Sequence, residues 1–490
     1  MFSGEIIMSE NNPEILKFIQ KQINETQFML NDELYYQNTK LTPRSEFEEI
    51  KFYIDEFLDG NNINRFITLP GLRGVGKSTI LLEVYDYLFN NKNINPENIL
   101  YISCEQLNYI QKCDIYATIE DYIKNFHQAS IKTLNHQIFL LIDESHYDKN
   151  WSLAGKMIYD QSRKIFMIFT GSSALNLNYD DEAARRIINY NINPLNYTQH
   201  LNLKYKYCPI DLSNALRDLI FTGNVENAIN CEQKVNNDLL NLKGYTSIDW
   251  DSYFKFGGFP QVMFDTRQRD IVKKMFKSVN TVIEKDLGTI KNITTDTQSY
   301  AMRILKFMAQ KYPGDISQNK LSSELKCSFS TINTLFYLFE KTQLLFHYDN
   351  YGGINHRTKK EKQYYFATPN IRHVINLTFG VTKLKEEEYE GILYENFVAS
   401  LLFNLINDDN FFDFEVFFEK RKGGVDFLLS KMFENPIPIE VGHKDKDKRQ
   451  VINAMNRYDS DYGIIISQTT NTIKMDEDII YIPMKTFSFI

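Results

Sequence analysis

The sequence predicts an α/β protein that begins with a parallel sheet flanked by helices. Between residues 61 and 200, short runs of β-prone residues alternate with stretches of helical periodicity, which is typical of parallel strands joined by helices. A glycine-rich turn at residues 71–79 links the first of these runs to a helix. We expect a mostly helical region over 201–380 and a smaller α/β region over 390–490.

The length of the chain predicts several domains. A chain of 490 residues is too long for one ordinary hydrophobic core, so about three domains are expected. The hydrophobic fraction of 43% is that of a folded globular protein and excludes a disordered chain. We divide the chain into a helical lead-in over 1–60, a sheet domain over 61–200, a helical region over 201–380 and an α/β region over 390–490.

Charge, cysteine spacing and hydropathy narrow the classes of function. The net charge of -8 argues against sequence-independent binding of nucleic acid by the whole surface, although a local basic patch could still bind it. The five cysteines show no CxxC spacing, which favours a reducing cytoplasm. No apolar run approaches the roughly 20 residues that span a bilayer, so we expect a cytoplasmic protein with no membrane association.

Local patterns place the lead-in helix and the strands. A helix is expected over 45–58, where Ser45 can cap the amino terminus and Glu48 follows three residues later. The β-prone runs predict five strands, at residues 66–69, 99–102, 138–142, 165–169 and 187–192. Helices between them would cover both faces of the sheet.

The turn after the first strand has the spacing of a nucleotide phosphate-binding loop. Gly71 is followed by four residues and then by Gly76, Lys77 and Ser78. Glycines let the backbone approach a polyphosphate, Lys77 would reach the β and γ phosphates, and the Ser78 hydroxyl would bind a magnesium ion. The expected nucleotide-binding residues are Gly71, Arg73, Gly74, Val75, Gly76, Lys77, Ser78 and Thr79. The alternative is a glycine-rich turn that binds nothing.

A second nucleotide signal lies at residues 138–144, IFLLIDE. A fully apolar strand ends in Asp143 and Glu144, so two carboxylates emerge where ligands bind in open α/β sheets. Asp143 would hold the magnesium ion, and Glu144 would orient and polarise the water that attacks the γ phosphate. The alternative is a solvated turn.

The fourth strand and the segment after it offer further polar groups. The hydroxyls of Thr170, Ser172 and Ser173 would lie near the γ phosphate if this strand lies between the first and the third, so that Ser172 or Ser173 would sense the phosphate. Arg185 and Arg186 precede the fifth strand. They either stabilise charge that develops in phosphoryl transfer or are ordinary solvated or salt-bridged arginines.

Together these motifs resemble the AAA-fold ATPases of archaea and bacteria that join a P-loop domain to a winged helix and a C-terminal restriction-endonuclease-like region. The resemblance rests on residues 71–78, Asp143, Glu144, Trp151, 170–173, Arg185, Arg186, 193–197 (NPLNY), 257–260 (GGFP), 284–287 (EKDL) and 394–399 (YENFVA). It implies an AAA-type ATPase domain over 61–200, with ATP and Mg²⁺ as ligands. It also implies that Arg185 or Arg186 points into a neighbouring subunit as an arginine finger, and therefore a homo-oligomer.

The helical region contains the pattern of a winged helix. Helices are expected over 319–325 and 330–341, followed by a hairpin around Gly352 and Gly353. The hairpin flank, residues 356–362, is basic, whereas the second helix has almost no positive charge. We therefore expect contacts of this basic wing with DNA phosphates rather than base reading by the helix. The alternative is a spacer packed on the ATPase domain.

The last region raises the question of a second active site. Three strands, a helix over 445–458 and a strand over 462–467 are expected. This order resembles the core of restriction-endonuclease-like nucleases. The resemblance implies a second metal site formed by Glu395, Asp426 and Glu440.

One position departs from the nuclease pattern. The lysine expected two residues after Glu440 is replaced by Gly442, with His443 and Lys444 beside it. A nuclease that uses Lys444 instead, and a structural or DNA-clasping domain without nuclease activity, both stay open.

We therefore predict an ATP-hydrolysing AAA-type ATPase that acts on or with DNA through a winged helix. Two alternatives remain: an ATP-gated switch that presents its C-terminal regions to a protein partner without turnover, and an ATP-regulated nuclease in genome defence. Glu144 favours hydrolysis, because a pure switch needs no water-activating carboxylate. The sequence does not indicate the oligomer number, the preferred DNA, the process served, or a choice between ATP and GTP.

Overall fold

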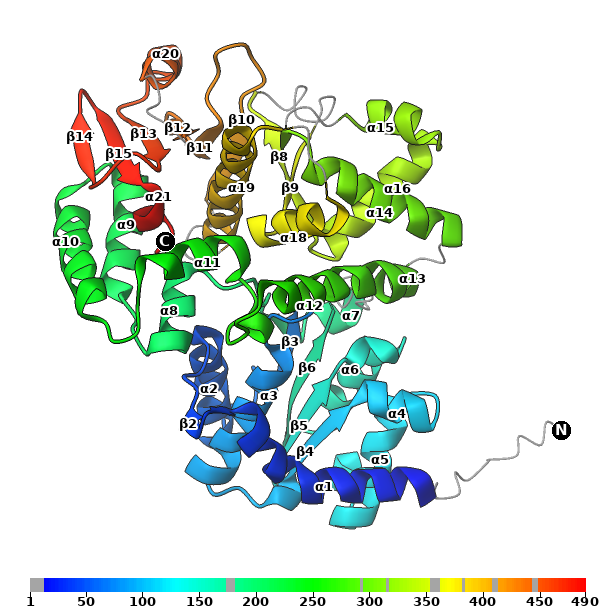
Figure 1. Cartoon of the computed structure of the whole chain (residues 1–490). Coiled ribbons are helices and arrows are strands. Elements are labelled where there is room, and N and C mark those ends of the chain that lie inside the picture. The colour runs from blue at the N-terminus through cyan, green and yellow to red at the C-terminus, as the bar shows by residue number, and fades with distance from the viewer. Residues whose placement is uncertain are drawn as a thin grey trace. The chain divides into compact units, whose positions relative to one another are not determined.

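Figure 1 shows the computed structural model of the chain. It describes residues 13–172, 181–290, 294–313, 317–352, 362–380, 384–407, 413–442 and 448–490. The chain divides into two compact units. The first consists of Met1–Leu72 and Gly76–Ile192, and the second of Arg73–Val75 and Asn193–Ile490. Within the described ranges, no helix is long and apolar enough to cross a membrane.

The first unit contains a five-stranded parallel sheet with the strand order β4-β5-β6-β3-β7. The strands are β3 (Phe66–Pro70), β4 (Ile99–Ser103), β5 (Ile138–Asp143), β6 (Ile165–Gly171) and β7 (Ile188–Asn189). All five lie where the apolar runs predict them, and the predicted α/β fold is confirmed. β7 is shorter than expected because it is an edge strand that pairs only with β3; beyond it, Ile192 forms a single bridge with Gly71.

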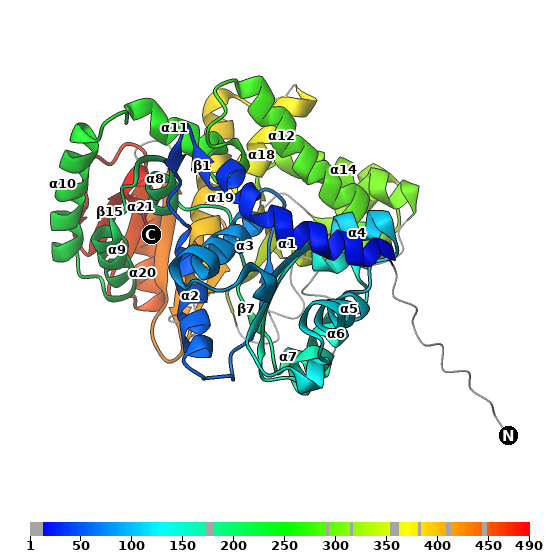
Figure 2. The ribbon, with the colours of Figure 1, turned by 90° about the horizontal axis from the view of Figure 1, so that it is seen from below.

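Helices cover both faces of this sheet (Figure 2). They are α1 (Pro13–Glu33), α2 (Ser45–Leu58), α3 (Lys77–Asp86), α4 (Cys104–Ile110), α5 (Ile115–His127), α6 (Trp151–Gln161) and α7 (Asp181–Ala184), and a small hairpin, β1 (Tyr35–Tyr36) and β2 (Thr39–Lys40), precedes α2. On one face, the ring of Phe57 from α2 packs against Phe139 and Phe166. On the other face, α1, α5 and α6 share a hydrophobic core with the remaining strand residues. The central strands are buried on both sides, which explains their continuous apolar runs.

The start of α2 differs in detail from the sequence prediction. The helix begins at Ser45 as expected, but the capping position is Arg44, and no side chain caps the helix. The Ser45 hydroxyl instead donates to the carboxylate of Glu46, which also pairs with Arg44. Ser45 is therefore the first helical residue and not the cap, because Glu46 competes for its hydroxyl.

The second unit is built on an eight-stranded mixed sheet with the order β14-β15-β13-β12-β11-β10-β8-β9. Its strands are β8 (Leu345–Asn350), β9 (Gln363–Phe366), β10 (Phe414–Phe418), β11 (Phe427–Lys431), β12 (Ile437–Gly442), β13 (Gly463–Ser467), β14 (Lys474–Asp476) and β15 (Ile479–Pro483). β10, β11 and β12 are antiparallel neighbours, and β13 pairs parallel to β12. The hairpin β8-β9 continues the same sheet, because β8 pairs with β10.

The helices of the second unit lie on and around this sheet. They are α8 (Tyr197–Tyr205), α9 (Ile210–Thr222), α10 (Glu226–Asn241), α11 (Ser247–Phe256), α12 (Gln268–Thr281), α13 (Leu287–Ile290), α14 (Thr295–Ala309), α15 (Gln318–Leu325), α16 (Phe329–Lys341), α18 (Pro369–Phe379), α19 (Glu386–Ile406), α20 (Arg449–Tyr458) and α21 (Met484–Phe487). The helices α15, α16 and α20 correspond to the helices predicted over 319–325, 330–341 and 445–458.

One hydrophobic core joins the beginning and the end of the second unit. Helices α8 to α11 bury their apolar faces together with α19 and the strands β10 to β13 and β15. The rings of Tyr197 and Phe489 lie 5.0 Å apart. The buried carboxylate of Glu232 accepts a 2.7 Å hydrogen bond from the N–H of Ile473. The regions predicted over 201–380 and 390–490 therefore share a core and a sheet.

The close contact between α6 and β3 gives a test of packing in the first unit. A Cβ at Gly155 would lie 2.3 Å from Cζ of Phe66, whose ring is fully buried. Because overpacking forces neighbouring groups to shift, we expect Gly155→Ala to lower the free energy of unfolding by roughly 1–3 kcal/mol in denaturant titrations. Gly391→Ala is the control, since no atom lies within 4 Å of the added methyl group in helix α19. An equal loss in both variants would contradict the packing explanation.

Candidate functional site

The glycine-rich loop between β3 and α3 has the backbone that the sequence predicts. Gly74 and Gly76 have φ angles of +86° and +99°, a left-handed conformation that favours glycine. A Cβ at Gly71 would lie 2.4 Å from the carbonyl oxygen of Ile192, so no side chain fits there. α3 then begins at Lys77 and directs its amino terminus at the loop.

The two basic residues of the loop already have partners. Lys77 is 5% exposed, and its Nζ donates to the carbonyl oxygens of Gly71 at 3.0 Å and Leu72 at 2.9 Å. The ammonium group is therefore held against the loop backbone. Arg73, which belongs to the second unit, pairs with the buried carboxylate of Asp286 at 3.0 Å.

Asp143 lies at the C-terminal end of β5 and is surrounded by hydroxyl groups. Tyr101 donates to its Oδ2 at 3.0 Å, Thr170 on β6 donates to its Oδ1, and the nearby Ser78 hydroxyl also favours the charged carboxylate. Burial and the neighbouring charge of Glu144 raise the pKa of Asp143, while the hydroxyls of Thr170 and Ser78 oppose the rise. The ends of β3, β5 and β6 thus bring together the residues that the two nucleotide motifs predict.

Glu144 follows in a left-handed backbone conformation with a φ of 54°. Its N–H donates to the Thr170 hydroxyl at 3.1 Å, so Thr170 binds both carboxylate-bearing residues. Its Oε2 lies 3.3 Å from Nδ1 of His146. Ser172, at the end of β6, is 3% exposed, and its Oγ has no hydrogen-bond partner among the described residues. Ser173 lies outside the described residues.

Sequence patterns did not single out His146, which the structure places between Glu144 and Ser172. The N–H of Ser172 lies 3.3 Å from the same Nδ1 that faces the Glu144 carboxylate. This nitrogen accepts from Ser172 when it carries no proton and donates to Glu144 when it does. A lone histidine two residues after the carboxylate pair has no spacing signal of its own, so only the pairing of β5 with β6 reveals its position.

The two candidate arginines differ in their surroundings. Nε of Arg186 lies 2.6 Å from Asp160, and its Nη1 donates to the carbonyl oxygen of Glu182. Arg185 is exposed in the turn after α7. Arg186 is therefore engaged within its own chain, whereas Arg185 faces solvent.

The second group of predicted site residues lies in the eight-stranded sheet. The N–H of Asp426 donates to the buried carboxylate of Glu440 at 3.2 Å, and Asp426 accepts from the N–H of Val441 at 2.8 Å. Glu395 accepts from Tyr365 at 2.9 Å. Burial, followed by the charges of Glu395 and Asp426, raises the pKa of Tyr365.

Two observations concern the second metal site predicted at Glu395, Asp426 and Glu440. Among the described residues, no three histidine, cysteine, aspartate or glutamate side chains form a group that could hold a metal ion. His443 and Lys444, which flank the expected lysine position, lie outside the described residues, as do residues 353–361 of the predicted wing. The second metal site stays a prediction.

Comparisons with known proteins agree with the loop and the sheet of the first unit. Residues 63–201 match the family described as AAA domain, and residues 247–380 match a domain of unknown function. An uncharacterized protein of Methanocaldococcus jannaschii is 28% identical over 91% of this chain and 88% of its own length. An uncharacterized protein of Haemophilus influenzae is 24% identical over 66% of this chain and 72% of its own. The Aeropyrum pernix ORC2 structure is 11% identical, covers 64% of this chain and 90% of that one, and has a TM-score of 0.36.

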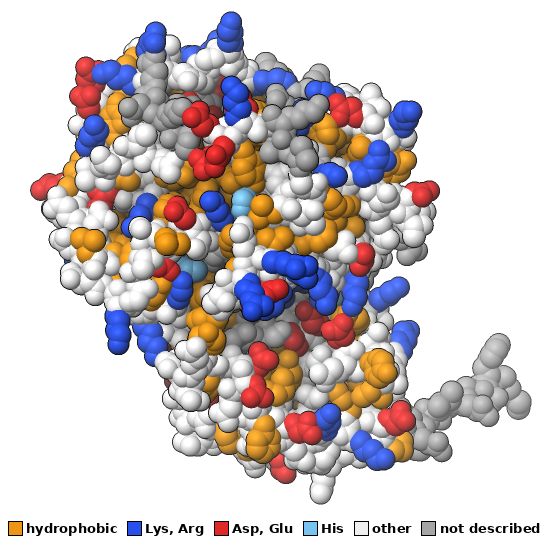
Figure 3. Space-filling model, viewed as in Figure 1, with side chains coloured by type: hydrophobic (Ala, Val, Ile, Leu, Met, Phe, Trp, Pro, Cys, Tyr) orange, Lys and Arg blue, Asp and Glu red, His pale blue; other side chains and the backbone are white. Residues whose placement is uncertain are grey.

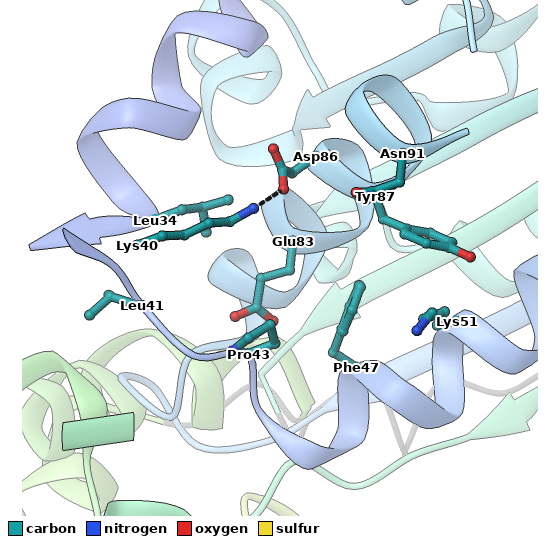
Figure 4. A pocket seen from close by; sticks show the side chains of 10 residues that line it. All are labelled: Leu34, Lys40, Leu41, Pro43, Phe47, Lys51, Glu83, Asp86, Tyr87 and Asn91. Atoms are coloured by element: carbon teal, nitrogen blue, oxygen red, sulfur yellow. Dashed lines mark hydrogen bonds and ion pairs between the residues drawn. The ribbon is translucent and has the colours of Figure 1, made fainter. Parts of the chain in front are cut away.

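A cavity of about 210 Å³ lies beside α3 (Figure 4). It is lined by Leu34, Lys40, Leu41, Pro43, Phe47, Lys51, Glu83, Asp86, Tyr87 and Asn91. Glu83 is 8% exposed, and its Oε2 has no hydrogen-bond partner in the described part of the chain. Burial raises the pKa of Glu83 to about 8 against the opposing charges of Arg44 and Lys40. The carboxyl group is therefore mostly protonated at neutral pH.

This raised pKa predicts a loss of stability with increasing pH. Between pH 4.5 and about 8 the folded protein keeps a proton on Glu83 that the unfolded chain releases. The contribution of this protonated carboxyl group to the free energy of unfolding is therefore complete below pH 4.5 and is lost as the pH rises through about 8. We expect Glu83→Gln, which stays neutral, to be more stable than the parent by about 1 kcal/mol or more at pH 8. Thermal unfolding at pH 6 and 8 measures this. The matched control is the exposed Glu49→Gln, whose unfolding should follow the pH dependence of the parent.

Proposed function

We propose that this protein, whose residues 63–201 are an AAA domain, binds ATP and hydrolyses it. One observation carries the proposal: the Thr170 hydroxyl donates to the Asp143 carboxylate, and the Ser78 hydroxyl lies near the same carboxylate at the end of the phosphate-binding loop. Because these residues come from three separate elements, a solvated turn or a glycine-rich turn without a ligand does not require their meeting.

The loop supplies the groups that bind phosphates. The backbone N–H groups of residues 74–79 and the amino terminus of α3 favour an anion. Lys77 can exchange its two carbonyl partners for phosphate oxygens, which are charged and form stronger hydrogen bonds. Ser78 and Asp143 fit a magnesium ion, since they are adjacent oxygen donors and one of them is a carboxylate. Bound magnesium would neutralise phosphate charge.

Glu144 is the proposed residue that orients the attacking water. The hydrogen bond from its N–H to Thr170 fixes its backbone, and Nδ1 of His146 lies 3.3 Å from its carboxylate. The buried Ser172 hydroxyl, which has no other described partner, is the proposed sensor of the γ phosphate. Arg185, which is exposed, is the proposed finger toward a second copy of the chain, whereas Arg186 is already paired with Asp160.

DNA is the proposed macromolecular partner. The order α14, α15, α16 and the antiparallel hairpin β8-β9 is that of a winged helix, which supports this part of the proposal. A second candidate function, an ATP-regulated nuclease, is favoured by the order α19, β10, β11, β12, α20, β13 and by the hydrogen bond from the N–H of Asp426 to the Glu440 carboxylate. Gly442 at the lysine position argues against it.

Phosphate release from ATP and magnesium, measured with and without DNA, tests the proposal. We expect Lys77→Ala and Glu144→Gln each to lower the rate about 100-fold or more, because the first removes a phosphate ligand and the second the base. Glu144→Gln should still bind ATP. The exposed Lys132→Ala is the control and should match the parent.

Three other results would change the conclusion. A parent that binds ATP and releases no phosphate would replace hydrolysis by an ATP-gated switch. An unchanged rate of phosphate release in Glu144→Gln would remove the proposed role of Glu144 as the base. DNA cleavage that is lost in Asp426→Ala and Glu440→Ala would establish the nuclease, whereas cleavage that persists in the double variant would remove it.

The position of His146 predicts a graded effect on the same reaction. Gln at this position can accept from the N–H of Ser172 and donate to Glu144 at once, whereas Leu can do neither. We expect His146→Leu to lower kcat at least about tenfold with unchanged ATP affinity, and His146→Gln to keep most of the activity. Equal losses of kcat in both variants would show that His146 only fills space.

A further inference from the structure

We propose that the exposed face of α12 binds the phosphodiester backbone of nucleic acid. This face carries Arg269, Lys273 and Lys277, all exposed. The three residues are spaced by four, so they lie on one side of the helix, and successive residues are separated by about 6 Å along its axis. The proposal deepens the DNA part of the proposed function and does not depend on ATP hydrolysis or on the wing.

None of the described residues neutralises the three cations. No carboxylate oxygen of a described residue lies within 4.0 Å of the charged nitrogens of Arg269, Lys273 or Lys277. Their neighbour Lys274, in contrast, pairs with Asp265 at 2.8 Å. In a chain with a net charge of -8, a row of three unpaired cations is a local exception that a polyanion would complement.

The opposite face of α12 holds the row in place. Met275 and Val279 are buried, and the ring of Phe276 packs edge-on against Phe379 of α18 at 5.4 Å. Lys306 of α14 lies over the same Phe379 ring, 4.7 Å from its centroid, and adds a fourth cation beside the helix. Figure 3 shows basic side chains gathered over α12. The cations therefore extend from a fixed helix and not from a loop.

The composition of this face favours nucleic acid over other anionic partners. The centres of protein interfaces are enriched in aromatic residues and depleted of lysine, whereas this row is lysine and arginine without an apolar anchor. A membrane-surface helix inserts its apolar face into lipid, but on α12 Met275 and Val279 are buried in the protein and Phe276 packs against Phe379. A repeating phosphate backbone matches a row of evenly spaced cations.

Binding of labelled oligonucleotides to the full chain, followed by fluorescence anisotropy between about 50 and 200 mM NaCl, tests the proposal. The variant combines Arg269→Gln, Lys273→Gln and Lys277→Gln. We expect at least a tenfold weaker affinity at the lowest salt. If each cation contacts one phosphate, the slope of the logarithm of the binding constant against the logarithm of the salt concentration is smaller in the variant than in the parent. The expected difference in slope is about 2.7 for a duplex and about 2.1 for a single strand, so it distinguishes the two ligands.

The control removes the same charge from other exposed positions, through Arg163→Gln, Lys132→Gln and Lys243→Gln. It should bind like the parent. The proposal is overturned if the α12 variant binds with the affinity and slope of the parent, or if the control loses as much. It is also overturned if polyglutamate of equal charge competes as well as DNA, since the row would then bind acidic protein without preference.

Phosphate release measured on the same α12 variant separates this inference from the ATPase. We expect the basal rate without DNA to be unchanged, because α12 supplies none of the proposed catalytic residues. A parent that hydrolyses ATP but binds no oligonucleotide would refute the α12 contact and leave the ATPase intact. A parent that binds oligonucleotide through α12 but releases no phosphate would support the α12 contact and refute ATP hydrolysis.

Discussion

The hydroxyl group of Thr170 fixes the relative positions of the two carboxylates at the candidate site. It donates to the carboxylate of Asp143 and accepts from the N–H of Glu144. Both bonds depend on the strand order, because β6 lies between β5 and β3 and the C-terminal ends of all three meet at one edge. Ser78, on the helix that follows β3, then reaches the same Asp143. The sheet therefore brings the proposed ligands for phosphate and magnesium together at one edge.

The sequence predicts the positions of secondary-structure elements where burial produces a local pattern of apolar residues. Buried parallel strands such as residues 138–142 are continuous apolar runs, so the five strands of the first unit could be located in advance. The helix α1 was missed, although Ile15, Phe18 and Ile19 recur at helical spacing. His146 could not be found from local patterns, because its partners lie on another strand. The shared core of the second unit could not be found either, since its members are separated by more than two hundred residues.

Buried acids in this chain are accommodated in different ways. Asp143 accepts hydrogen bonds from the hydroxyls of Tyr101 and Thr170, and the nearby Ser78 hydroxyl also favours its charged form against burial. Glu232 accepts from the N–H of Ile473 and from Thr486, although burial still raises its pKa. Glu83 has the least compensation, and its pKa rises to about 8. A buried carboxylate whose charge is stabilised by hydroxyl groups can rotate to bind a cation. A buried carboxyl group without such hydrogen bonds instead gains or loses a proton as the pH changes.

The core that joins α8 to α10 with the last strands has a consequence for biosynthesis. All strands of the first unit are translated by residue 189, so that unit can fold while the chain is still attached to the ribosome. Helices α8 to α10 emerge next, but their partners in β13 and β15 are translated only after residue 462. Apolar faces such as that of α9 stay exposed during this interval. We therefore expect chaperones that bind apolar helices to recognise nascent chains of this protein.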